Sequence, residues 1–257
     1  MKDEHIFYNP FRMLSPALDY EIEHIEEFHQ KPVSEGISLE EGLLVMISKL
    51  IEVGRLLSRS VVTSSASQMD RCEKLAKDVH RQEKILTRDL VESKVEDDLL
   101  RALIRFPYRL ERIGDMFESI LNCCRIKAQH GVPFSDNAYA EMDQLFNLLL
   151  EMMNNLRDAL RTPNKLILRA IIEDGKKLNE LIEEFKLAHW MRLEAGFCAV
   201  EASSLYRDIL DSAKSVNEYV SKMSQTLLEL VTGGSALKEK RDPDANSIVS
   251  NTVQTKQ

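Results

Sequence analysis

Two carboxylates four positions apart, Glu111 and Asp115, stand in the stretch YRLERIGDMFESI at residues 108–120. If this stretch is helical, both side chains project from one face and repel each other by roughly 0.2–0.5 kcal/mol. A hard or borderline metal cation between them would reverse that repulsion. The spacing alone also fits a solvated acidic face, with Arg109 and Arg112 beside the carboxylates. The pair is therefore a candidate metal site, and a solvated acidic face is the alternative.

A glycine, Gly114, directly precedes the second carboxylate. In a helix interior, glycine costs about 1 kcal/mol relative to alanine. The expected compensation is room for another helix, or for a metal-bridging ligand, to approach the backbone at this point.

Six stretches have the apolar periodicity of long amphipathic helices. Ser38 and Glu41 form a predicted capping box before the first, and Gly233 with Gly234 is expected to stop the last. With 44% apolar residues, 6% aromatics and few glycines or prolines, the composition also favours an all-α protein. The predicted helices span residues 39–65, 68–92, 96–129, 136–161, 163–192 and 195–231.

The helices form two sets of three, separated by the break HGVPFSD at residues 130–136. A single offset of 96 residues places Asp78 on Asp174 and Asp115 on Asp211. We therefore predict an internal duplication, folded as two antiparallel three-helix bundles in tandem. The predicted parts are an N-terminal extension (1–35), a first repeat (36–130), a second repeat (131–232) and a disordered tail (233–257).

Charge, apolar runs and cysteines narrow the class of protein. The net charge of −8 without a basic stripe argues against a nucleic-acid partner. No apolar run reaches the roughly 18 residues of a membrane span, and the first residues lack a signal-peptide stretch, so we expect a cytoplasmic chain that does not span a membrane. Free core thiols are predicted for the four cysteines, Cys72, Cys123, Cys124 and Cys198.

The stretch YRLERIGDMFESI resembles the signature of the PhoU family, whose third helix carries an E(D)xxxD motif within an ERIGD-like string. The likeness is strongest in residues 110–115, and two three-helix repeats support it over 39–231. DILDSAKSVNEY at 208–219 is similar to a second copy, and the chain resembles in particular the PhoU-like domain attached to sodium/phosphate cotransporter proteins. The resemblance implies a cytosolic regulator that contacts a membrane phosphate transporter and, in some members, a sensor kinase. Many members bind multinuclear iron or zinc clusters through their acidic motifs.

Carried over residue by residue, the motif implies that Glu111 and Asp115 are metal ligands in the first repeat. In the second repeat Asp211 matches the second carboxylate, but Arg207 replaces the first. Arg207 would repel a cation or pair with Asp211 one turn away. Asp208 could substitute for the missing carboxylate from a shifted angle, so the second site is expected to be the weaker one.

The middle helices offer further acids at or near the family's positions, namely Asp78, Glu83 and Asp174. Each is also a plausible surface charge. His80 follows Asp78 by two positions, which puts it on nearly the opposite helix face, so we predict a surface histidine. Trp190 is expected to pack at the bundle end, and a docking hot spot is the alternative.

The sequence thus predicts a non-enzymatic regulator of phosphate uptake that acts through metal-dependent contact with a membrane phosphate transporter, and it leaves a homo-oligomer open. One alternative is a metal-free helical adaptor with a vestigial motif. Another is a di-iron carboxylate enzyme, suggested by the ExxH spacing of Glu21 and His24. Such an enzyme needs a second motif of this kind and two further glutamates. No Walker A loop, GxGxxG or serine-hydrolase elbow is present.

Overall fold

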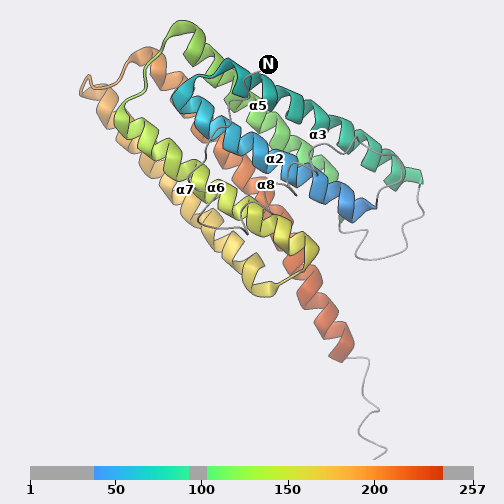
Figure 1. Ribbon diagram of the computed structural model, residues 1–257. Helices are drawn as coiled ribbons and strands as arrows, with labels where there is room; N and C mark the ends of the chain where they lie inside the picture. The colour runs from blue at the N-terminus through green and yellow to red at the C-terminus, as the bar shows by residue number, and fades with distance from the viewer. Residues whose placement is uncertain (1–37, 93–102, 240–257) are drawn as a thin grey trace, which may run out of the picture.

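The computed structural model describes residues 38–92 and 103–239, which are almost entirely helical and contain no strand (Figure 1). The all-α class expected from the sequence is therefore confirmed. No helix in this part of the chain combines the length and the apolar character that crossing a bilayer requires. The helices are α2 (Leu39–Thr63), α3 (Ala66–Glu92), α5 (Phe106–His130), α6 (Asp136–Arg161), α7 (Lys165–Glu194) and α8 (Val200–Glu239).

Several helix ends follow from capping residues in the sequence. The predicted capping box is confirmed at α2: Ser38 Oγ accepts from the Glu41 amide, and Glu41 Oε2 accepts from the Ser38 amide, both at 3.2 Å. Helix α5 ends at Gly131, whose φ of 62° is left-handed and suits glycine. Ser135 and Asn164 cap the starts of α6 and α7.

Two predicted helix boundaries are wrong, and one lies partly outside the described residues. Helix α8 begins at Val200 rather than 195 and continues through Gly233 and Gly234 to Glu239. Two glycines lower helix propensity without forbidding helical dihedral angles, so they did not end this helix. Helix α5 begins at Phe106, and the predicted part at 96–102 falls outside the described residues, as do the proposed extension at 1–35 and residues 240–257.

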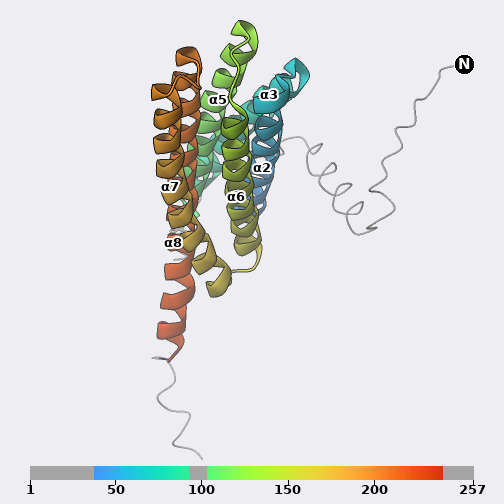
Figure 2. The same ribbon diagram turned by 90° about the vertical axis from the view of Figure 1, so that its left-hand side faces the viewer.

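The helices pack as two three-helix bundles, α2–α3–α5 and α6–α7–α8, that lie side by side (Figures 1 and 2). Contacts of α2 with α6 and of α5 with α8 join the bundles, and one continuous apolar core runs through both. The apolar faces of α5 and α8, which the helical periodicity of the sequence predicts, face this core; Phe117 and Tyr206, for example, are almost fully buried. Helix α8 projects beyond its neighbours at one end (Figure 2).

The four cysteines are free, as predicted. Cys72, Cys123 and Cys124 are buried on α3 and α5, whereas Cys198 is partly exposed in the α7–α8 connection. Burial raises the pKa of the Cys72 and Cys124 thiols to about 12 and that of Cys123 to about 11. These three side chains therefore act as small apolar core residues at neutral pH.

A polar network is buried where α6, α7 and α8 meet. Glu141 accepts two hydrogen bonds of 2.7 Å from the guanidinium of Arg192 and a third from the hydroxyl of Tyr206. His189 stacks on the Tyr206 ring at 4.6 Å, and its Nε2 lies 2.9 Å from Ser203 Oγ. Burial, and then the charge of Arg192, lower the pKa of His189, so the imidazole is neutral at pH 7.

The glycine of the acidic motif is not required by helix packing. A Cβ atom on Gly114 would lie 3.8 Å from Leu50 Cδ2 and from Val79 Cγ1, which are ordinary contacts. The expectation that this glycine lets another helix approach the backbone is therefore wrong. Gly175 of α7 differs, because a Cβ there would lie 2.5 Å from Ser221 Oγ.

We expect alanine at these two glycines to change stability in opposite directions. Gly114→Ala should raise the free energy of unfolding by about 0.5–1 kcal/mol through helix propensity. Gly175→Ala should lower it by about 1–3 kcal/mol, because Asn217, which donates to the Gly175 carbonyl at 2.8 Å, must move. Urea unfolding followed by circular dichroism measures both. Shifts of the same sign in the two variants would contradict this account.

Candidate metal centre

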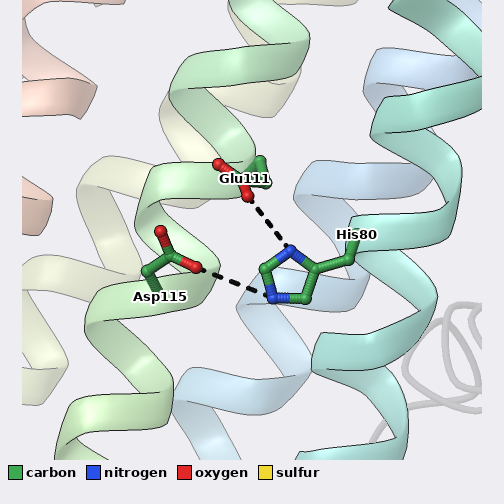
Figure 3. A group of neighbouring side chains, drawn as sticks. All are labelled: His80, Glu111 and Asp115. Carbon is green, nitrogen blue, oxygen red and sulfur yellow. Dashed lines mark hydrogen bonds and ion pairs between the residues drawn. The ribbon is translucent and has the colours of Figure 1, made fainter.

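An imidazole and two carboxylates converge between α3 and α5 (Figure 3). His80 of α3 places Nδ1 3.2 Å from Glu111 Oε1 and Nε2 3.6 Å from Asp115 Oδ1. The three side chains are 23–28% exposed, so they are partly shielded from water but reachable from it. Of the residues described, only these three form a group of at least three metal-ligating side chains with ligand atoms within 4.8 Å of one another.

The group arises from helix geometry and from helix pairing. Glu111 and Asp115 share one face of α5 because they are four apart, and that face lies against α3. Glu118 adds a third carboxylate one turn further along, with Oε1 3.4 Å from His80 Nε2. The two ring nitrogens thus face different acids: Nδ1 faces Glu111, whereas Nε2 faces Asp115 and Glu118.

His80 corrects the expectation from the sequence. We predicted a surface histidine because Asp78, two positions earlier, was expected to face the motif. In the structure His80 faces the motif, and Asp78 lies toward α2 instead. A histidine on the helix that packs beside the acidic motif was a signal in the sequence. It could be used only with knowledge of which face of α3 contacts α5.

The donor set fits a borderline divalent cation. Imidazole nitrogen together with carboxylate oxygen is a ligand combination for zinc and for non-haem iron. Around a tetrahedral zinc ion with bonds of about 2.0–2.1 Å, ligand atoms lie roughly 3.3–3.4 Å apart. The separations from Nε2 to Asp115 and Glu118, 3.6 and 3.4 Å, are close to that spacing.

An arginine already neutralises part of this acidic group. Arg112 Nη1 lies 2.5 Å from Asp115 Oδ2, the oxygen that does not face His80. A hydrogen bond with Tyr219 of α8, and then the charge of Asp115, raise the pKa of Arg112. A metal at the centre would therefore share the Asp115 carboxylate with a guanidinium.

The other predicted ligands of the first repeat do not join this group. The carboxylate of Asp78 lies 3.5 Å from the ammonium of the buried Lys49 and also pairs with Arg81. Glu83 accepts a 2.7 Å hydrogen bond from Thr87 on its own helix. Asp78 thus balances a buried lysine, a structural role that opposes metal ligation.

The second repeat has lysines in place of the imidazole and of one acid. Lys186 of α7 lies 2.6 Å from Asp211, and Lys214 lies 2.7 Å from Glu183. The pairing of Asp211 with Arg207 that the sequence suggested is thus replaced by one with Lys186. Asp208 is exposed. Asp174 pairs with Lys177 at 2.9 Å on its own helix, and among the described residues it belongs to no group of three or more metal-ligating side chains.

The fold is that of PhoU. The crystal structure of PhoU from Pseudomonas aeruginosa matches with a TM-score of 0.67 and 13% identity, over 84% of this chain and 99% of that chain. The crystal structure of the phosphate transport system regulatory protein PhoU from Streptococcus pneumoniae matches with a TM-score of 0.66 and 14% identity, over 81% and 96%. No family profile and no curated protein sequence matches the chain. The similarity confirms the PhoU-like fold expected from the acidic motif and the duplication.

Proposed function

We propose that this chain is a cytoplasmic regulator of phosphate uptake that binds iron or zinc at the His80–Glu111–Asp115 group. One observation carries the proposal: within a PhoU fold, the acidic motif of α5 meets an imidazole of α3 at ligand spacing. The bound metal would act by strengthening contact with a membrane phosphate transporter, and a sensor kinase is a further partner to test. No enzymatic step is part of this function.

The two ring nitrogens of His80 suggest different roles for the acids. A metal-bound imidazole commonly donates its other N–H to a carboxylate, which fixes the ring. Nδ1 already has such a partner in Glu111, at 3.2 Å. In the proposed site, Nε2 and Asp115 hold the ion, Glu118 is a further carboxylate one turn along α5, and Glu111 orients the imidazole. A multinuclear cluster would need Glu111 as a direct ligand as well.

The lysines of the second repeat support one metal centre per chain. Lys186 lies against Asp211 as His80 lies against Asp115, so an ammonium charge stands where the first repeat has an imidazole. A metal cation beside that ammonium would be repelled. We therefore expect Asp208 and Asp211 not to hold an ion, despite their place in the duplicated motif.

Metal analysis of the purified protein tests this proposal. Protein prepared without chelator should retain iron or zinc, and Asp115→Asn combined with Glu118→Gln should lose it. The matched control is Asp208→Asn combined with Asp211→Asn, which removes the same charge from the second repeat and should keep the metal. Equal losses of metal from both double variants would contradict the expectation that only the first repeat holds the ion.

Phosphate uptake in cells lacking the gene tests the regulatory role separately. Restoration by the native chain, but not by the metal-free double variant, is the expected result. Restoration by both would favour the metal-free helical adaptor. Oxygen consumption by the iron-loaded protein with a reductant would instead favour the di-iron enzyme, whose ExxH motif at Glu21 and His24 lies outside the described residues.

A further inference from the structure

Exposed apolar side chains gather around the α7–α8 connection. Five of the nine large hydrophobic residues that are exposed in the described part of the chain fall between positions 187 and 200, and we call these five the apolar tip. Their exposed fractions run from 62% to 78%. The members of the apolar tip are Leu187, Trp190, Met191, Phe197 and Val200.

The apolar tip has no partner within the described fold. Leu187, Trp190 and Met191 are spaced i, i+3, i+4, so they form one stripe on α7. The opposite face of the same turn carries the buried His189, which packs on Tyr206. The expectation that Trp190 packs at the bundle end is therefore wrong. A concentrated stripe of this kind on a folded surface is typical of a binding site.

Unpaired carboxylates border the apolar tip. Glu184 and Glu194 share the face of Leu187 and Met191, and Glu201 follows Val200. All three are exposed, and the ion pairs found among the described residues include none of them. The nearest basic residues of α7 are already engaged, Lys186 with Asp211 and Arg192 with Glu141. The border of the tip on α7 is therefore negative, whereas the exposed Arg207 of α8 is near enough to His189 for its charge to contribute to lowering the pKa of that imidazole.

A cavity of about 250 Å³ opens beside the apolar tip. Phe197 forms part of its wall, together with Phe134, Ala138, Ala202 and Tyr206. Tyr206 is fixed by its hydrogen bond to Glu141 and by stacking on His189. His189 also lines this cavity, so the cavity lies on the face of α7 opposite to the stripe and meets the apolar tip only at Phe197.

We propose that the apolar tip binds a basic amphipathic helix of a partner protein. An apolar face would cover the stripe of Leu187, Trp190 and Met191, and flanking lysines or arginines would meet Glu184 and Glu194. An anionic membrane surface is disfavoured because the same carboxylates would be repelled. A second copy of the chain is disfavoured because a two-fold contact would bring two negative borders together. This site is independent of the metal centre.

Trp190 is the only tryptophan of the chain, so its fluorescence reports on the apolar tip directly. The probe is a synthetic amphipathic helix of leucine and lysine, titrated into the full-length protein at low salt. We expect a saturable shift of the emission to shorter wavelength. A leucine–glutamate helix of the same pattern should cause no shift, and a shift of similar affinity with both peptides would overturn recognition by charge.

Matched variants locate the site. Glu184→Lys with Glu194→Lys, and separately Leu187→Ala with Met191→Ala, should each weaken binding at least about tenfold. Two controls remove comparable groups elsewhere, Glu229→Lys on α8 and Leu166→Ala at the start of α7, and should leave affinity unchanged within about twofold. Unchanged affinity in the tip variants overturns the proposal. So does an emission shift caused by phosphatidylglycerol vesicles, or one caused by raising the protein concentration alone.

Discussion

Replacing Glu141 by alanine is expected to lower the free energy of unfolding by about 3–5 kcal/mol, the usual cost of removing one partner from a buried ion pair. The side chains of Glu141 and Arg192 are only 14% and 13% exposed. Without the carboxylate, the guanidinium loses two hydrogen bonds of 2.7 Å, and the Tyr206 hydroxyl loses its acceptor. Arg192 cannot shed its charge in response, because the ordinary pKa of a guanidinium is far above neutral even without Glu141.

Glu183→Ala is the matched control for this measurement. Glu183 also accepts a 2.7 Å hydrogen bond from a cation, Lys214, but its side chain is 58% exposed. Exposed pairs contribute about 0–1 kcal/mol, so this variant should unfold almost like the native chain. Denaturant unfolding measures the free energy of unfolding of both variants. Similar losses of this free energy would show that burial does not govern what the Glu141 network contributes to stability.

Replacing His80 by alanine is expected to weaken zinc binding by about 100-fold or more. The variant loses the only imidazole of the His80–Glu111–Asp115 group, and Arg112 competes with the ion for the remaining Asp115 carboxylate. Thermal unfolding with and without zinc measures the effect. A ligand at 100 times its Kd stabilises the folded state by about 2.7 kcal/mol, and this gain should nearly disappear in the variant.

Three further variants separate ligands from orienting groups at the metal centre. Glu111→Gln should weaken zinc binding about 10–100-fold, the range typical of a group that orients a ligand. Asp115→Asn should have the larger effect, because its Oδ1 faces Nε2. His130→Ala removes an exposed imidazole at the end of the same helix α5 and should change nothing. Native zinc stabilisation in the His80 variant would mean that the carboxylates alone hold the ion.

The two proposed sites lie in different repeats and differ in what they recognise. The metal centre belongs to α3 and α5, whereas the apolar tip belongs to α7 and its connection to α8. Glu141 of α6 bonds Arg192 of α7 and Tyr206 of α8 and so ties the end of α7 that carries the stripe to both neighbouring helices; its loss should therefore also weaken binding of the basic helix. The metal centre should be unaffected by it, since the two share no residue.

The sequence by itself determined what depends on neighbouring residues in the chain. The capping box at Ser38 begins a helix through local hydrogen bonds. The left-handed Gly131 ends a helix through its dihedral angles. The 3.6-residue period put Glu111 and Asp115 on one face, because that spacing is a property of any α-helix. The buried stripes of α5 and α8 followed from the same period, and so did the all-α class.

Only the tertiary structure decided which residues face one another across helices. His80 faces Asp115, and Lys186 faces Asp211, so these α3 and α7 positions are 106 residues apart, whereas Asp115 and Asp211 are 96 apart. A single offset cannot describe both, because the α3 and α7 positions that face the acids are not the positions that the 96-residue offset aligns. Packing between helices sets this register, and no local pattern encodes it. The imidazole of the candidate metal centre, the lysines of the second repeat and the exposure of Trp190 all depend on such packing between helices.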